Sequence, residues 1–279
     1  MSMSNFDEDY DPYEDFDEMA EDNYDFVEPR TVDGVDMFYG IFHRMAGRRN
    51  RLTVWDEFLD FVSYNLAQAA GVKERKSKQL EKIEKKVSGI DQHLMNMLFE
   101  LLFEIYKKEG AWDVLTIVAD RCGILTPEQK HKYLYNRNCS NYAEGILAMY
   151  RNMFREASPN KHSELYEVVR LRGCGAGAPI LQAVELLLEE GPNFSSHIMF
   201  HLIAPDSIAA KMCYIQLSLL KCCATVSTET QYKAYGKNPV GELHAPKGAF
   251  CTNAFYDSVW SQRRLEGILE QLKMENQSN

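Results

Sequence analysis

A glycine-rich turn is the stretch of this sequence best suited to hold a small-molecule cofactor. Residues 173–177 read Gly-Cys-Gly-Ala-Gly and lie between a β-prone run at 164–171 and a helical run at 179–190. In such a turn the backbone N–H groups and the N-terminus of the following helix face the ligand. Gly175 and Gly177 are therefore candidates for cofactor binding, although the tight packing of a turn would favour the same glycines.

An acidic residue follows the next predicted strand, where a nucleoside's ribose would need it. The apolar run 196–204 predicts this strand, and Asp206 comes shortly after it. Its carboxylate could accept hydrogen bonds from ribose hydroxyls, or it could be the N-cap of the helix expected up to residue 220. A third strand is expected at 223–226. Strands that alternate with helices in this way predict an α/β fold with a parallel sheet.

The remaining elements must position this core. Before it, apolar residues at helical spacing predict helices. Three of these helices are expected at 34–45, 91–108 and 112–122. A fourth is capped by Thr53 and ended by Gly71, a fifth is charged and lies within 73–86, and a sixth begins at Thr126-Pro127-Glu128. After it, glycines and prolines in 228–250 predict a long loop or irregular strands, and 252–274 predict a C-terminal helix. The chain thus divides into an acidic tail (1–28), a helical region (29–157) and an α/β core with a C-terminal helix (158–279).

The order of these features resembles a known family. Residues 171–180 read LRGCGAGAPI and residues 211–220 read KMCYIQLSLL. This is similar to the S-adenosylmethionine-dependent N6-adenine DNA methyltransferases of phages, plasmids and restriction–modification systems, whose turn reads D/E-P-x-C-G-S-G-G-M-L. The resemblance runs from about Trp55 to Leu265. It implies an α/β, Rossmann-like class I methyltransferase core with a helical N-terminal extension, S-adenosylmethionine as cofactor, and DNA as partner.

The same resemblance assigns residues to the cofactor site. A D-V-L sequence at 113–115 precedes, in the family, a G-Q-F-F-T-P loop that contacts the methionine end of the cofactor. Its nearest match is 131–136, where only the aromatic Tyr133 is kept. The cofactor-binding residues implied by the resemblance are Tyr133, Cys174, Gly175, Gly177 and Asp206.

The sequence departs from the family where the reaction takes place. The family binds the target amine with D/N-P-P-Y/F after its fourth strand, and this chain has no such motif; Asn238-Pro239-Val240 is a fragment of it. The family has a D-x-D motif after its second strand. Asp206 matches the second acid of this motif, but the first acid falls on Ala204. The Gly-Asn pair that often follows the family's third strand is replaced by Thr228-Glu229. These losses predict an inactive relative that binds DNA or a defence-system protein, with no catalytic residue assigned. The alternative is an active adenine-specific methyltransferase.

Charge is distributed unevenly along the chain. The formal net charge is −10, but residues 1–28 contain 12 Asp/Glu and no Lys/Arg. The remaining 29 of the 41 acids stand against 31 bases, so the rest of the chain is slightly basic. Binding to a polyanion such as DNA is therefore compatible with the body of the protein.

Two basic segments are candidates for contact with DNA phosphates. The residues concerned are Arg44, Arg48, Arg49, Arg51, Lys76 and Lys78. The segment 73–86 also contains Glu at helical spacing from Lys, which is typical of a solvated helix. The acidic tail contains six aromatic residues, so it is expected to be disordered and to act either as a solubiliser or as a strip that occupies a basic groove of this protein or of a partner.

Composition and residue spacing narrow the kinds of site and the cellular compartment that the sequence allows. The seven cysteines have no C-x-x-C or metal-type spacing, which favours free thiols in a reducing, cytoplasmic compartment and no metal site. The acidic N-terminus does not predict a signal peptide, and no apolar run is long enough to predict a membrane span. His197 and His201 lie in a strand pattern and are expected to be structural.

Overall fold

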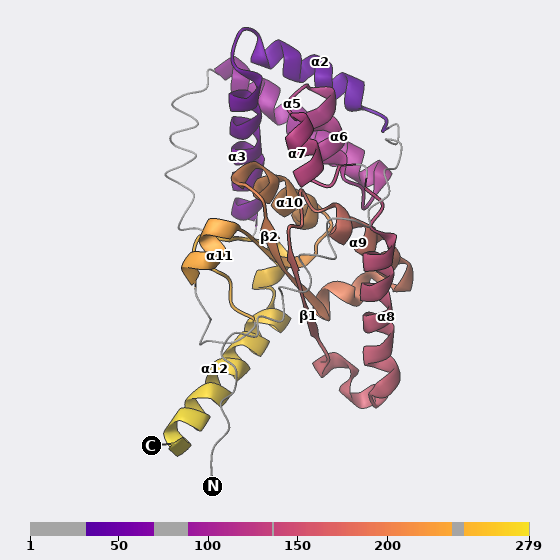
Figure 1. The fold of residues 1–279 in the computed structure, drawn as a ribbon, viewed down its shortest axis with the longest axis vertical. Coiled ribbons are helices and arrows are strands. Elements are labelled where there is room, and N and C mark those ends of the chain that lie inside the picture. Colours follow the sequence, from indigo (N-terminus) through magenta and orange to yellow (C-terminus); the bar gives the residue numbers. More distant parts are fainter. Residues whose placement is uncertain (1–31, 70–88, 136, 236–242, 279) are drawn as a thin grey trace.

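The computed structural model describes residues 32–69, 89–135, 137–235 and 243–278 (Figure 1). The acidic tail, Gly71, the charged segment 73–86 with Lys76 and Lys78, and the Asn238-Pro239-Val240 fragment lie outside these residues. The fold is α/β, as the sequence predicts, with a four-stranded sheet of order β1-β2-β3-β4. Strands β1 to β3 are parallel, and β4 pairs antiparallel with β3.

Helices outnumber strands in the described part of the chain. The α-helices are α2 (Val35–Ala46), α3 (Arg51–Ala69), α5 (Gly89–Glu109), α6 (Val114–Arg121), α7 (Pro127–Lys132), α8 (Ser140–Glu156), α9 (Ala178–Glu190), α10 (Ser207–Leu219), α11 (Glu229–Tyr235) and α12 (Ser258–Ser278). The strands are β1 (Glu167–Arg172), β2 (Ile198–Ala204), β3 (Cys223–Thr228) and β4 (Phe250–Cys251). Three short 3-10 helices are η1 (Pro159–Glu164), η2 (Pro192–Ser196) and η3 (Asn253–Tyr256).

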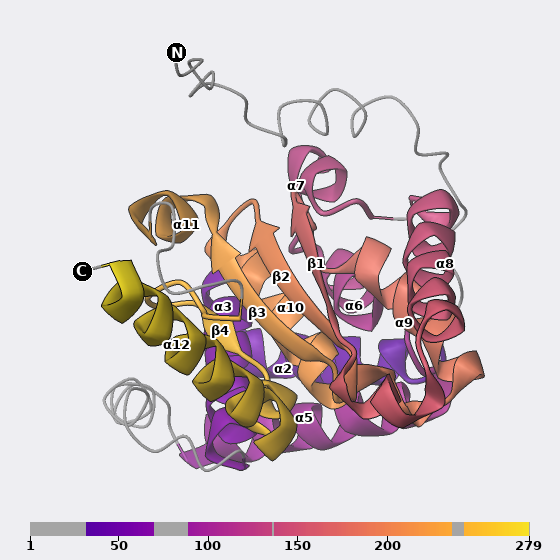
Figure 2. The ribbon, with the colours of Figure 1, turned by 90° about the horizontal axis from the view of Figure 1, so that it is seen from below.

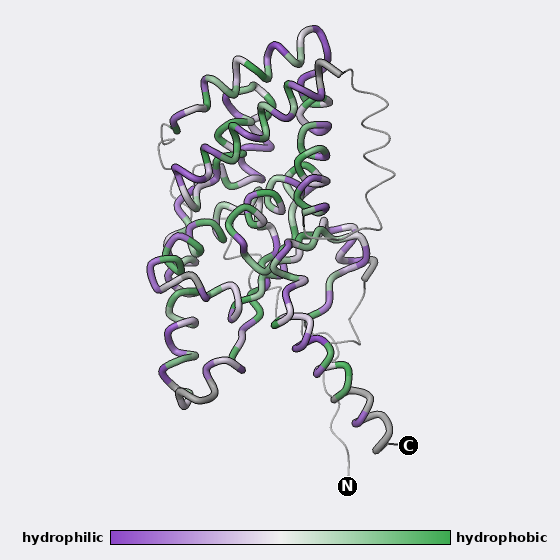
Figure 3. Tube along the Cα trace, turned by 180° about the vertical axis from the view of Figure 1, so that it is seen from behind, coloured by the Kyte–Doolittle hydropathy of each residue, from purple (hydrophilic) through white to green (hydrophobic). Residues whose placement is uncertain are grey.

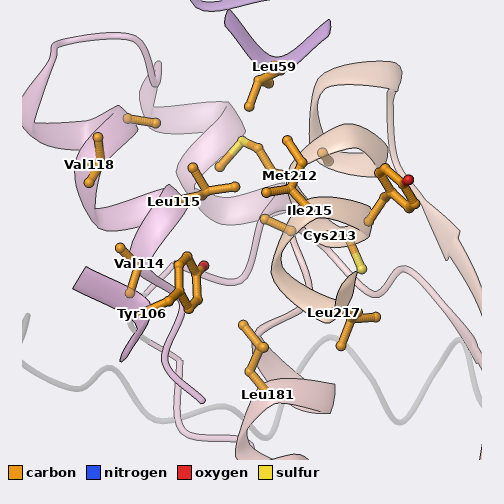
Figure 4. Close-up of a cluster of buried hydrophobic side chains, with 14 of the residues drawn as sticks. Leu59, Tyr106, Val114, Leu115, Val118, Leu181, Met212, Cys213, Ile215 and Leu217 are labelled. Carbon is orange, nitrogen blue, oxygen red and sulfur yellow. The ribbon is translucent and has the colours of Figure 1, made fainter. Parts of the chain in front are cut away.

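Helix α10 is the centre of the packing. Its residues from Ala209 to Ser218 are all buried, because the helix lies between the sheet and helices α3 and α6. Figure 4 shows Met212 and Ile215 of α10 facing Leu115 of α6 and Leu59 of α3. A helix that is apolar on all sides is expected only in such a position. The N-terminal helices and the sheet therefore share one hydrophobic core.

The opposite face of the sheet has a smaller core. Met199 of β2 and Cys223 of β3 pack there with Phe255 of η3 and Trp260 of α12. Helix α12 then extends away from the body (Figures 1 and 2), and Figure 3 shows hydrophobic and hydrophilic residues alternating along it. Its exposed apolar residues include Leu265 and Leu269.

Several predicted elements differ from the structure. Thr53 is not an N-cap: α3 begins at Arg51, and the Asn50 side chain accepts from the Thr53 N–H at 3.1 Å. Part of the predicted loop 228–250 is helix α11, begun by reciprocal hydrogen bonds between Thr228 and Gln231. By contrast, Thr126 and Gln129 form a capping box at the start of α7, as the sequence indicates.

The described residues contain neither a membrane-spanning helix nor a cluster of metal ligands. None of the helices is both long and apolar enough to cross a membrane. No group of three or more His, Cys, Asp or Glu side chains in these residues could hold a metal ion. All seven cysteines are free thiols, and six of them are buried.

Candidate functional site

The glycine turn follows β1 and leads into α9. Gly173, Gly175 and Gly177 have φ angles of +70°, +59° and +111°, which side chains rarely adopt. The N–H groups of Gly173 and Cys174 donate to the Ile203 carbonyl of β2, at 2.9 and 3.2 Å. The Gly177 N–H donates to the Cys174 carbonyl at 2.9 Å. Three of the five N–H groups in the turn are thus used within the protein, not presented to a ligand.

Tyr133 lies directly against the turn. A Cβ atom on Gly175 would be 2.5 Å from the Tyr133 carbonyl oxygen and 2.7 Å from its carbonyl carbon. A Cβ atom on Gly177 would be 3.2 Å from the Cys213 sulfur of α10. Both glycines therefore make room for other parts of this chain. The packing interpretation of the turn accounts for both of them.

Asp206 has two structural roles. It is the N-cap of α10, where its Oδ1 accepts from the N–H groups of Ile208 and Ala209, both at 2.9 Å. The Tyr133 hydroxyl donates to Oδ1 at 2.8 Å and to Oδ2 at 2.9 Å. Burial and the nearby Asp206 charge raise the pKa of Tyr133, so its hydroxyl stays protonated and continues to donate.

The turn also rests on a buried polar network that the sequence pattern did not reveal. Gln216 of α10 donates from Nε2 to the Ala176 carbonyl at 2.7 Å and to Asp113 Oδ1 at 2.9 Å. Its Oε1 accepts from the Leu115 N–H at 3.1 Å and from the Tyr106 hydroxyl. The available signal was a glutamine within the largely apolar helix α10, since a buried group of this kind needs partners.

Burial dominates the electrostatics of this network. Desolvation raises the pKa of the Asp113 carboxyl above its ordinary value of 3.8. Burial, followed by the Asp113 charge, raises the pKa of Tyr106 well above its ordinary value. The network joins α5, α6, α10 and the glycine turn, and therefore fixes the turn relative to the N-terminal helices.

All five residues assigned to the cofactor site come together in the structure, within one cluster at the ends of β1 and β2. Their groups, however, are occupied by one another. The Tyr133 main chain covers Gly175, and both carboxylate oxygens of Asp206 accept hydrogen bonds from within the protein. In this arrangement the residues do not fit S-adenosylmethionine at the turn, because the positions that the resemblance assigns to its amino-acid end and ribose are taken.

The arginine cluster lies elsewhere, at the junction of α2 and α3. Arg44 and Arg48 are exposed. Arg49 pairs with Glu57, and the Arg51 Nη1 donates to the Cys122 carbonyl at 3.4 Å. Two of the four candidate arginines therefore also support the fold, and two project from it.

His197, which the structure places just before β2, and His201 of β2 both make hydrogen bonds inside the fold. His197 Nδ1 lies 2.9 Å from the Leu165 carbonyl, and His201 Nδ1 lies 2.7 Å from Thr225 Oγ1.

Comparison with family models, curated proteins and solved structures finds no match to this chain. The glycine turn and the arginine cluster are therefore the two sites that bear on its function.

Proposed function

We propose that this chain is a methyltransferase-like protein that does not transfer methyl groups and acts by binding DNA. The contact between Tyr133 and Gly175 is the observation that supports the absence of methyl transfer. The only residue small enough at position 175 is glycine, and the space it leaves is filled by main chain, which moves less readily than a side chain. A turn built to cradle a ligand would leave that space to the ligand.

The sheet supports the same conclusion. Methyl transfer to adenine needs groups that bind the flipped base and its amine, and the resembled family supplies them after a fourth strand. In the part of the chain that the structure describes, the fourth strand is the two-residue, antiparallel β4. After β3 the chain passes directly into α11, where Glu229 pairs with Arg172 at 2.6 Å.

The proposal that the protein binds DNA rests on the arginines at the α2–α3 junction. Arg44 and Arg48 are exposed cations, and guanidinium groups bind phosphate oxygens through paired hydrogen bonds. Such contacts give affinity without sequence specificity. The buried thiols are consistent with action in a reducing cytoplasm.

A second candidate is an active adenine-specific methyltransferase. One observation favours it: Tyr133, Gly175 and Asp206 meet at the place where the resemblance puts the cofactor. Activity would require the Tyr133 main chain to move off Gly175 and its hydroxyl to release Asp206.

Calorimetry separates the two candidates. We expect no heat of binding when S-adenosylmethionine is added at millimolar concentration, and no transfer of labelled methyl to duplex DNA. Saturable binding would show that the turn accepts the cofactor, and methyl incorporation that is lost on Asp206→Ala would establish the active enzyme.

DNA binding is tested by fluorescence anisotropy with a labelled duplex at low salt. We expect the double variant Arg44→Glu/Arg48→Glu to bind more weakly, because each exposed arginine neutralises about one phosphate. The double variant Arg155→Glu/Lys273→Glu is the control: it makes the same charge change at exposed positions of α8 and α12, at the other end of the molecule from α2 (Figure 1). Equal affinities for all three proteins would favour a defence-system protein as the partner.

A further inference from the structure

The outer face of α2 combines apolar and basic residues in one stripe. Met37 is 64% exposed, Ile41 is partly buried, and Arg44 is exposed, at a spacing that places them on one side of the helix. Arg48 follows just beyond the helix end. The opposite side of α2 is buried against α5 and α6. The outer stripe therefore becomes more basic with distance from the start of α2.

The acids close to this stripe are already paired with other cations. Helices α2 and α3 contain four acidic residues, and each has a partner. The ion pairs are Asp36–Arg121, Glu57–Arg49, Asp56–Lys211 and Asp60–Lys211. The charges of Arg44 and Arg48 are thus not offset by the acids of their own two helices.

Residues 1–31 join the structure at the start of this stripe, since α2 begins at Val35. A helix of 12 residues is about 18 Å long, which an extended chain covers in about six residues. A chain running back along α2 from residue 32 would pass Met37 within its first one or two residues. It would place Glu28 beside Arg44, and Asp25 and Phe26 beside Arg48.

We propose that the stripe on α2 is the docking site of this chain's own acidic segment, residues 7–28. Its carboxylates take the positions of phosphates on the arginines, with Glu28 and Asp25 nearest to them. The tether keeps the segment at an effective concentration on the order of millimolar, so weak contacts are enough. This inference rests on the proposed DNA-binding role of the arginines, and it makes the segment a competitor of DNA for them.

The test uses the full chain without DNA, so that it does not depend on the proposed function. Chymotrypsin cleaves after aromatic residues, and mass spectrometry follows cleavage after Tyr24 and Phe26. At low salt we expect Arg44→Glu/Arg48→Glu to speed this cleavage about fivefold, since exposed ion pairs contribute weakly but two are lost. In wild type, 0.5 M salt should have the same effect.

The double variant Arg155→Glu/Lys273→Glu is the matched control and should leave the rate at the wild-type value. An unchanged melting temperature shows that each variant is folded. Equal cleavage of wild type and Arg44→Glu/Arg48→Glu at low salt would overturn the docking proposal. Faster cleavage in Arg155→Glu/Lys273→Glu as well would overturn the location of the docking site on α2, because the attraction would then follow total charge. If docking is found but the duplex does not bind, the DNA role alone fails.

Discussion

Gly173 and Gly175 have similar left-handed backbones but different surroundings. A Cβ atom on Gly173 would meet nothing within 4 Å, whereas one on Gly175 would meet Tyr133 main chain at 2.5 Å. Gly173→Ala should therefore cost only the backbone strain, about 1–2 kcal/mol. Gly175→Ala should cost that strain plus about 1–3 kcal/mol for the clash. Urea unfolding of the two variants measures the difference directly.

The pair matters because it separates strain from contact. If Gly173→Ala and Gly175→Ala lose equal stability, the Tyr133 main chain can move away from position 175 at little cost in free energy. A cofactor could then reach the turn, and the active candidate would gain support. A larger loss for Gly175→Ala would show that the turn is held by its own chain.

Asp113 gives a pH-dependent prediction. Desolvation raises the pKa of its carboxyl in the folded state, so the folded protein favours the protonated form. That contribution to stability is fully present below the unfolded pKa of about 3.9 and is lost as pH rises through the folded value. Asparagine cannot ionise, and its oxygen can still accept from Gln216 and the Thr116 N–H.

We therefore expect Asp113→Asn to be more stable than wild type at pH 7, by less than about 1 kcal/mol because Asp113 is partly exposed. The advantage should vanish below about pH 4. Chemical unfolding at both pH values provides the measurement. A variant less stable than wild type at pH 7 would mean that the ionised carboxylate is needed by the network.

At the scale of elements, Arg263 attaches α12 to the sheet. It is 8% exposed and donates to the carbonyls of Ser196, Ser163 and Leu165 at 2.5, 3.0 and 3.2 Å. Its guanidinium also lies over the Trp260 ring, 4.7 Å from the centroid. One side chain thus joins α12 to the segments before β1 and β2.

Arg263→Met should lower the free energy of unfolding by about 3 kcal/mol, because three carbonyls lose their donor. Arg263→Lys should recover part of this, since an ammonium cannot reach all three in the same fork geometry. The exposed Gln262→Ala, one residue away, should change stability by less than about 0.5 kcal/mol. Thermal unfolding of the three variants is sufficient. A loss for Gln262→Ala as large as that for Arg263→Met would show that α12 is marginal throughout.

The elements that local chemistry determines were the ones that the sequence predicted well. Helix α7 begins at a capping box, and α10 is continuous and apolar, so both were predictable from residues close in sequence. Helix α11 was missed because the glycines and prolines that follow it dominated the pattern, whereas its start depends on Thr228 and Gln231. Thr53 was misread because Asn50, three residues earlier, is the better cap.

The candidate site was predictable in its position but not in its state. The strand–glycine–helix order brings Gly175 and Asp206 to one edge of the sheet in any fold of this type. That Tyr133 fills the site depends on α7, which is separated from the turn by α8 and β1 and is placed by long-range packing. A spacing rule contains no information on that packing, so it could not distinguish an open turn from a filled one.

At the scale of the whole molecule, charge is divided between the N-terminal segment and the folded body. Residues 1–28 contain 12 acids and no bases, whereas the rest of the chain has a slight excess of bases. If the body binds DNA as proposed, a covalently attached polyanion of this kind would compete with DNA for the same cations. The competition weakens with salt, because exposed charges are screened over about 10 Å at 0.1 M.

We therefore expect a variant that lacks residues 1–28 to bind duplex DNA more tightly than the full chain at low ionic strength. Its advantage should shrink towards none at about 0.5 M salt, where both the segment and the duplex are screened. Anisotropy titrations of both proteins over a salt series measure this. Adding Arg44→Glu/Arg48→Glu to the truncated chain should abolish the gain, since the freed cations are then absent. If truncated and full-length chains bind equally at low salt, the acidic segment does not mask the DNA-binding surface. It would then act on another molecule, and a basic protein partner captured only by the full chain would identify its role.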